Sequence, residues 1–480
     1  MKRLLLRNYL LSVMASLGIS TLSLQAFAGT VWSGTPPDPF HTEGVIHRDT
    51  VGLTDPLGHD CAVPGRALTF PAAVSLALCR TPQTRSAWAA AHQQAAALGS
   101  AESAWLPTVS VAGEETRNYI DGSGNIASTA QNTGSATANL TWTLYDFGAR
   151  TGRIKSARSL VDAAALTASS TVQQTVSSVV QAYYGVVAGD ALLVSAKTTE
   201  DVTAHSLDIA RALSQGGVGT LADVLQAETA HGQAVLARVQ ADQSAKSARG
   251  TLSVTLGLTA DEPFKLAAEP VPTEIPALAA RMSDLMAEAA RQRPDLKAAQ
   301  ARRDAAEANI TVARAAAWPT ISIGALHSFT AITSLSNQNY NNQIGISVTV
   351  PIFSGFNTSY GVRQAQAALQ VQDATLEQVG LSVTLDVWNG YYALDSANQQ
   401  LTATSGLLKT SDDNLQVALG RYQAGVGSIL DVLTAQTAAG IARQLRIDAE
   451  LGWKVARAQL ALALGRLSSA EPLQDRLAIP

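Results

Sequence analysis

The chain has 480 residues and a formal net charge of −4, and only 15% of its residues are charged. Without an overall basic character the chain lacks the charge that attracts nucleic acid, which excludes a nucleic-acid-binding role on electrostatic grounds. A length of this order favours two or three structural units over one.

The first 28 residues have the pattern of a signal peptide for export. A basic start is followed by a largely apolar stretch at residues 10–24, and Ala26-Phe27-Ala28 fits a small-x-small cleavage site. We expect the mature chain to begin at Gly29; an uncleaved membrane anchor is the alternative. No cysteine follows the cleavage site, which excludes a lipoprotein signal, and we expect no later helix that is apolar enough to span a membrane.

Residues 29–66 form an N-terminal extension to which we assign no role. The chain has two cysteines, Cys61 and Cys79. Because an exported chain matures in an oxidising compartment, we expect these two to form a disulfide that fastens the extension to the first helix. Two free thiols are the alternative.

The rest of the chain contains an internal duplication. Tyr183-Tyr184 returns as Tyr391-Tyr392 at an offset of 208 (391 − 183), and the same offset relates two Gly-Val-Gly turns, each followed by Asp-Val-Leu. A constant offset predicts two copies of one structural unit, at residues 67–258 and 282–466, with a linker at 259–281 and a tail at 467–480.

Each copy has the same predicted order of elements. A helix comes first, from about Leu68 to Trp105 and again from about Met282 to Trp318, and a proline follows each one. Two strands come next, then a very long helix, a glycine-containing turn and a return helix. The strands alternate apolar with small polar residues; the apolar positions are Val109, Val111, the even positions from Ala136 to Leu144, Ile321, Ile323, and the even positions from Ile344 to Ile352.

This alternation fits either a half-buried sheet of a soluble protein or a membrane barrel with lipid outside and water inside. Strands of about ten residues are long enough for a tilted crossing of a bilayer. Four strands cannot close a barrel, because membrane barrels need about eight or more. The chain must therefore associate with copies of itself if these strands enter a membrane, and three copies would supply twelve strands.

The long helices have the spacing of coiled coils. Val172, Val176, Val179, Tyr183 and Val186 step by four and three, and no proline occurs between Arg150 and Leu213. About 65 helical residues would extend on the order of 100 Å, far beyond an ordinary globular helix. Gly185, Gly189 and Gly390 either mark bends or allow neighbouring helices to pack closely. The paired tyrosines (Tyr183, Tyr184, Tyr391 and Tyr392) are expected to pack in the coiled coil.

No pattern for catalysis is found. The seven histidines have no metal-ligand spacing, and the chain has neither a phosphate-binding glycine loop nor a nucleophile elbow. We therefore expect no enzyme activity, no cofactor and no metal site. An enzyme on a helical scaffold and a periplasmic structural or adapter coiled coil are the alternatives from other classes.

Two strand-to-helix junctions and the two turns carry a resemblance to a known family. The junctions are Leu144-Tyr145-Asp146-Phe147-Gly148 and Pro351-Ile352-Phe353-Ser354-Gly355. Together with the turns, and in this order, they make the chain similar to the TolC outer-membrane efflux family, closest to its type I secretion (CyaE-like) branch. The resemblance covers about Leu68 to Gly465.

The resemblance implies a fold that is mainly α-helical with a transmembrane β-sheet. It implies a homotrimer in the outer membrane, with a twelve-stranded barrel that continues into a long periplasmic coiled-coil tunnel. It further implies the exit channel of a tripartite export system, working with a periplasmic adapter protein and an inner-membrane ABC or proton-driven pump. The substrate, a secreted protein or small molecules, stays open.

The resemblance also assigns roles to residues near the turns. Asp431 would face the tunnel entrance and form an acidic ring, while Thr434 stands where the family often has a second carboxylate. Asp223 would accept a hydrogen bond from Tyr422 that holds the entrance closed. N-terminal capping of the return helices is the alternative role for both aspartates.

The turns themselves would be periplasmic tips that contact the adapter. Their glycines are expected to supply positive φ angles, and Gly219 and Gly427 also to allow an adapter helix to approach. The residues are Gly217, Val218, Gly219, Gly425, Val426 and Gly427. Aromatic residues near the junctions are expected to form a membrane-interface girdle, with ordinary core packing as the alternative; these are Trp142, Tyr145, Phe147, Phe353 and Phe356.

Overall fold

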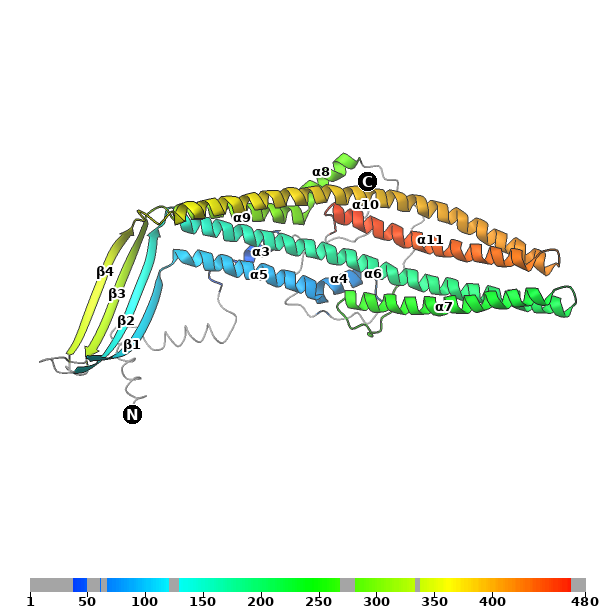
Figure 1. Cartoon of the computed structure of the whole chain (residues 1–480), viewed down its shortest axis with the longest axis horizontal. Coiled ribbons are helices and arrows are strands. Elements are labelled where there is room, and N and C mark those ends of the chain that lie inside the picture. Colours follow the sequence, from blue (N-terminus) through cyan, green and yellow to red (C-terminus); the bar gives the residue numbers. More distant parts are fainter. Residues whose placement is uncertain are drawn as a thin grey trace. The chain divides into compact units, whose positions relative to one another are not determined.

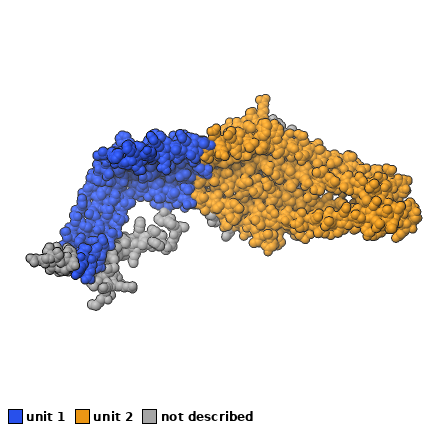
Figure 2. Space-filling view, viewed as in Figure 1, with its two compact units in different colours: residues 1–49, 92–163, 300–374 blue, residues 50–91, 164–299, 375–480 orange. Residues whose placement is uncertain are grey.

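The computed structural model describes residues 38–49, 61, 67–120, 129–267, 281–332 and 337–467. The expected signal peptide at 1–28 lies outside these residues, as do most of the extension, the linker and the tail. Within the extension, a short helix α3 (Glu43–Asp49) is described. The chain divides into two compact units (Figure 2), one holding residues 92–163 and 300–374 with the N-terminus, the other holding 50–91, 164–299 and 375–480.

The first unit contains one antiparallel sheet of four strands in the order β1-β2-β3-β4 (Figure 1). The strands are β1 (Thr108–Ile120), β2 (Thr129–Tyr145), β3 (Thr320–Ile332) and β4 (Asn337–Thr349). All four predicted strands are present, and they are longer than the ten residues expected. The predicted continuation of β4 to Ile352 is wrong, because Pro351 lacks the N–H that would extend a ladder.

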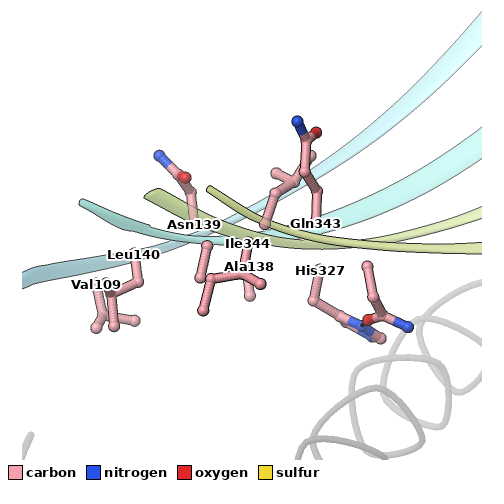
Figure 3. A pocket seen from close by; sticks show the side chains of 10 residues that line it. Val109, Ala138, Asn139, Leu140, His327, Gln343 and Ile344 are labelled. Atoms are coloured by element: carbon pink, nitrogen blue, oxygen red, sulfur yellow. Dashed lines mark hydrogen bonds between the residues drawn. The ribbon is translucent and has the colours of Figure 1, made fainter. Parts of the chain in front are cut away.

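The register of the sheet separates an apolar face from a polar face. Val109, Leu140, Ala325 and Ile344 pair across the four strands and so share one face. Asn139 and Gln343 project from the other face of the sheet (Figure 3). The apolar face is uncovered in the protomer, with Ile344 81% exposed. A large exposed apolar face is unusual for a water-soluble chain, so the sheet requires a non-aqueous or protein neighbour.

Towards the β1–β2 and β3–β4 loops, charged and polar residues also occupy the face that is apolar nearer the helices, which the alternation did not predict. Glu115 and Arg117 continue the face that carries Val109 and Val111. On the same face of β4, Tyr340 is the last apolar residue on the side of the β3–β4 loop. The polar Asn342 separates it from the apolar Ile344. The ten steps from Val350 back to Tyr340, at about 3.3 Å each and tilted about 40°, give an apolar band of roughly 25 Å.

The two predicted first helices are each broken in two. The structure has α4 (Phe70–Arg80) followed by α5 (Pro82–Glu102), and α8 (Met282–Gln292) followed by α9 (Pro294–Ala315). A proline begins the second helix of each pair, and the residue before a proline is disfavoured in helical conformation. Thr81 and Arg293 are accordingly extended, with ψ angles of 135° and 123°.

The long helices confirm the duplication residue by residue. α6 (Ala149–Gln215) and α10 (Asn357–Gln423) both have 67 residues, and α7 (Leu221–Thr255) and α11 (Ile429–Ala463) both have 35. Their starts differ by 208 (357 − 149 and 429 − 221). Each long helix folds back through a short turn into its return helix (Figure 1). At about 1.5 Å per residue, the 67-residue helices extend roughly 100 Å.

The expectation of no later apolar helix is wrong for α6. One 18-residue window in this helix has a mean hydropathy of 1.4, enough to cross a membrane by length and composition, and 33% of that window is buried. The predicted coiled-coil positions Val176, Val179 and Tyr183 are fully buried in a core shared with α4 and α11. A helix packed in a protein core has the same length and composition.

Four glycines fix how the helices of the second unit pack. A Cβ on Gly189 would lie 3.3 Å from Cα of Ala245, and one on Gly390 would lie 3.2 Å from Cα of Leu460. Gly257 and Gly465 end α7 and α11 with φ angles of +74° and +76° and lie against the breaks at Arg80 and Arg293. Of the two roles left open for Gly189 and Gly390, close packing is the one the structure shows.

Candidate functional site: the helical tips

Each helical tip is closed by a glycine in left-handed conformation. Gly217 has a φ of +76° and Gly425 a φ of +73°. The N–H of Val218 donates to the carbonyl of Leu213, and the N–H of Val426 donates to the carbonyl of Arg421, both at 3.0 Å. These bonds satisfy carbonyls that the end of a helix would otherwise leave unpaired. A residue with a Cβ would strain either turn.

Gly219 and Gly427 have a different role from the one expected. Neither has a positive φ, so the prediction of left-handed glycines is wrong for these two. A Cβ added to Gly219 would lie 3.0 Å from the nitrogen of Ser214, and one added to Gly427 would lie 3.0 Å from the nitrogen of Tyr422. They let the chain double back tightly against the end of the preceding helix.

The tips present apolar side chains to the outside. Val218 Cγ1 lies 4.0 Å from the position of a Cβ on Gly425, so the two turns are neighbours. Exposed apolar side chains clustered at two adjoining turns are typical of a protein-interaction surface. They are Val218, Leu221, Leu225, Val426 and Leu430, with exposed fractions of 55–70%.

Both tip aspartates cap the return helices. The carboxylate of Asp223 accepts from the N–H of Thr220 at 2.9 Å, and Thr220 Oγ1 accepts from the N–H of Asp223 at 3.2 Å. The carboxylate of Asp431 accepts from the N–H of Ser428 at 3.4 Å. These two reciprocal capping boxes show that both aspartates cap the N-termini of their helices, which was the alternative role considered for them. Asp431 is nevertheless exposed, so its charge is accessible from solvent.

The expected hydrogen bond between Asp223 and Tyr422 is not formed. The Tyr422 side chain is buried, and its hydroxyl has no hydrogen-bond partner. The Asp223 carboxylate accepts from the N–H of Thr220 instead. Burial, and next the negative charge of Asp223, raise the pKa of Tyr422. The two side chains therefore interact through charge and not through a bond.

Thr434 shares the exposed side of α11 with Asp431. Its hydroxyl donates to the carbonyl of Leu430 at 2.8 Å. A hydroxyl satisfied by its own helix contributes no charge and little polarity to a passage. The position for which the resemblance raised a second carboxylate therefore carries no charge in this chain.

Gln436 is a site residue that the sequence reasoning missed. Its side-chain amide donates to Ser206 Oγ on α6 at 2.6 Å and lies 3.5 Å from the carbonyl of Val202. Gln436 is 5% exposed and lies among buried residues of α11 that include Val432 and Ala439. A glutamine in the apolar seam of a helical repeat was the available signal.

Arg150 was also missed, at the junction of β2 and α6. Its guanidinium pairs with Asp146 at 3.1 Å and donates to the carbonyls of Thr143 and Leu144 at 2.6 and 2.8 Å. It also lies over the Trp105 ring at 4.1 Å. The spacing of Asp146 and Arg150 by four residues was the available signal.

The remaining candidates fall into three groups. Cys61 and Cys79 are joined by a disulfide with a Cα–Cα distance of 6.0 Å. The girdle aromatics are exposed, and four of them form two ring pairs, Tyr145 with Phe147 at 4.7 Å and Phe353 with Phe356 at 5.6 Å. Among the residues described, no group of three or more His, Cys, Asp or Glu side chains is arranged to hold a metal ion.

The amino-acid sequence is similar to those of known proteins. The model of the outer membrane efflux protein family matches residues 73–258 and 285–466. Protein CyaE of Bordetella pertussis is 29% identical over 380 residues, which are 78% of this chain and 79% of that protein. The toluene efflux pump outer membrane protein TtgC of Pseudomonas putida is 29% identical over 301 residues, 60% of each chain.

Solved structures show the same fold at low identity. A crystal structure of CusC has a TM-score of 0.73 at 21% identity and covers 86% of this chain and 97% of that one. The open state of the Neisseria gonorrhoeae MtrE channel has a TM-score of 0.69 at 20% identity, covering 86% and 96%. These findings exclude the periplasmic adapter alternative: the chain belongs to the outer membrane efflux protein family and has the fold of its TolC-like outer-membrane channels.

Proposed function

We propose that three copies of the chain form the exit duct of a type I secretion system. The observation that carries the proposal is the extent of the match to CyaE, which covers 78% of this chain against 60% for TtgC. The uncovered apolar face of the sheet supports membrane insertion, and the open edges of β1 and β4 support closure by neighbouring copies. Small-molecule efflux is the second candidate, supported by the match to TtgC.

The experiment measures two effects of deleting the gene, on protein secretion and on tolerance to small molecules. The gene is removed, and the proteins in the culture medium are measured alongside tolerance to toluene and antibiotics. Loss of one or a few secreted proteins with unchanged tolerance supports secretion. Lost tolerance with an unchanged set of secreted proteins selects efflux instead. Restoration by the wild-type gene is the control.

The apolar tips are proposed to dock a periplasmic adapter. Val218 and Val426 are each about 70% exposed and lie in the middle of the Gly-Val-Gly turns. Changing both to Glu should abolish co-purification with the adapter, because a charge would be buried at the contact. The trimer should survive, since neither side chain packs in the core. Thr229→Glu, on an exposed part of α7, is the matched control; adapter binding by the double variant would contradict the docking site.

Energy for export is proposed to come from the partners. The adapter would link the tips to an inner-membrane ABC or proton-driven pump, and the chain itself would catalyse no reaction. Asp431, three copies of which would meet at the entrance, is proposed to favour cations there.

A further inference from the structure

We propose that the N-terminal extension is a brace across the break between α4 and α5. The brace has two attachments, one on each side of the break. The helix α3 docks on α5, and the Cys61–Cys79 disulfide joins the extension to the last turn of α4. This role of the extension is independent of what the duct exports.

The first attachment is the contact of α3 with one face of α5 (Figure 1). Thr42 is 3% exposed, and its Oγ1 lies 3.5 Å from the position of a Cβ on Gly99. The carboxylate of Glu43 lies 4.0 Å from Nδ1 of His92, which is seven residues before Gly99 and so on the same face. Ile46 is fully buried. Because a seven-residue helix is too short to be stable alone, α3 depends on this docking.

The second attachment is covalent and lies immediately before the break. The Cα atoms of Cys61 and Cys79 are 6.0 Å apart, and Arg80 is the last residue of α4. The extended Thr81 then interrupts the helix. A chain segment held on both sides of such a break restricts the conformations that the break can adopt, in the same way that a cross-link restricts a loop.

The corresponding break in the second half is held by different contacts. Arg293 donates to Asp386 of α10 at 2.7 Å and also pairs with Asp295. At the first break the flanking basic residues are Arg80 and Arg85, and neither forms an ion pair with any residue that the structure describes. The duplication therefore kept the break in both halves, with ion pairs across it in the second half and the extension across it in the first.

Oxidation completes the brace. The two thiols of the reduced chain lose two electrons and two protons when the bond between their sulfur atoms forms. A protein disulfide of a periplasmic thiol oxidant accepts them: one cysteine thiolate attacks that disulfide, the other displaces the oxidant from the mixed disulfide, and the oxidant leaves as a dithiol. The brace is therefore complete only after export, in an oxidising compartment.

Limited proteolysis of the purified full-length protein tests the brace at the break itself. Trypsin cuts a folded chain where it unfolds locally, and Arg80 and Arg85 flank the first break while Arg291 lies beside the second. We expect Cys61→Ser to be cut after Arg80 and Arg85 severalfold faster than the wild type, with the rate after Arg291 unchanged. Wild-type protein treated with dithiothreitol should behave as this variant does. Mass spectrometry of the fragments identifies each cut.

Ile46→Asp tests the other attachment while the disulfide stays intact. A buried charge should undock α3 and accelerate the same two cuts. Adding Cys61→Ser to this variant should accelerate them little further, because loss of either attachment releases the brace. Gly44→Ala is the matched control, since its Cβ would meet no atom within 4 Å, and it should be cut as slowly as the wild type.

Two results would overturn the brace. One is equal acceleration at both breaks, which indicates general destabilisation. The other is an unchanged rate after Arg80 and Arg85 in the reduced wild type. Because proteolysis requires no channel activity, a wild-type protein that forms no channel would contradict the proposed function alone.

Discussion

The two tip aspartates show how one residue can combine a structural and a functional role. Both occupy the third position of a return helix and accept a backbone hydrogen bond through Oδ2. Asp223 is half-buried beside Tyr422, whereas Asp431 is exposed. Because capping engages a single carboxylate oxygen, the other oxygen of Asp431 remains available to ions. The capping and ring roles, posed as alternatives from the sequence, are compatible at Asp431.

Asp431→Asn should reduce the cation preference of the channel. The substitution removes one charge per protomer from the proposed entrance but keeps a side chain that can still accept the capping bond. In a salt gradient across a planar bilayer, the reversal potential should move towards zero. Asp223→Asn is the matched control, because it alters the same capping position in the first hairpin. Equal shifts in both variants would show that the effect does not come from Asp431 facing the passage.

The residues at the tips differ in how far sequence alone could place them. Gly217 and Gly425 lie two residues after the ends of long helices, and such positions favour a left-handed glycine whatever surrounds them. The bond between Gln436 and Ser206 joins residues 230 positions apart, so its geometry depends on how two hairpins pack. The failed Asp223–Tyr422 bond has the same origin, because a local cap competes with a distant partner and the cap is formed within one turn.

At the scale of elements, a buried arginine joins strand to helix in the first half only. Arg150 is 4% exposed and its partner Asp146 is 13% exposed. The second half carries Ser354 and Thr358 at the equivalent positions, with hydroxyl oxygens 3.2 Å apart. The duplication preserves the backbone of this junction, and Phe147 and Gly355 both have positive φ angles of 50° and 62°. The two junctions therefore share a backbone conformation, and the Arg150–Asp146 ion pair is present only in the first.

Arg150→Met should impair assembly by leaving Asp146 and two strand carbonyls without their donor. Removing one member of a buried ion pair typically costs about 3–5 kcal/mol. We expect fewer heat-resistant oligomers in outer-membrane extracts and a lower unfolding temperature for those that form. Arg153→Met, on the exposed side of the same turn, should behave as wild type. Wild-type oligomer yield in the Arg150 variant would show that the contact is dispensable.

The break between α8 and α9 predicts a dependence of stability on pH. Arg293 donates to Asp295 at 2.9 Å and to Asp386 at 2.7 Å, tying the break to α10. Burial alone would raise the pKa of Asp295, but the hydrogen bond and charge of Arg293 lower it below its ordinary value. Because the folded-state pKa is depressed, this stabilisation is complete above the unfolded pKa of about 3.9 and is lost as the pH falls through the folded value.

The unfolding temperature of the purified protein should therefore fall more steeply below about pH 4 in the wild type than in Asp295→Asn. The variant should also be less stable at pH 7, where the charged pair is intact in the wild type. Asp284→Asn, exposed in the first turn of α8, is the control. Parallel curves for wild type and Asp295→Asn would exclude this carboxylate as a source of acid sensitivity.

For the whole molecule, the sequence predicted the order of elements and the faces of the sheet because both depend on short-range periodicity. Strand alternation and the constant offset of 208 are visible without any tertiary information. The prolines at 82 and 294 were equally visible, and the broken helices follow from them by a local rule. The contact of Gly465 with Arg293 required the fold, because it joins α11 to a break 172 residues earlier (465 − 293).

The assignment of the two sheet faces can be tested with adjacent residues of β4. Ile344 lies on the apolar face, in the row of Leu140 and Ala325, and Gln343 lies on the opposite face (Figure 3). If the apolar face meets lipid, Ile344→Lys places a charge near the middle of the apolar band, at a cost of about 2–4 kcal/mol per protomer. A closed ring of three protomers would incur that cost three times, so we expect little or no assembled channel in the outer membrane.

Gln343→Lys, one position away, should assemble normally and reduce cation conductance, because its charge would lie in the water-filled lumen. Normal assembly of Ile344→Lys together with failure of Gln343→Lys would invert the faces, and the duct model would then have its lipid and water sides exchanged.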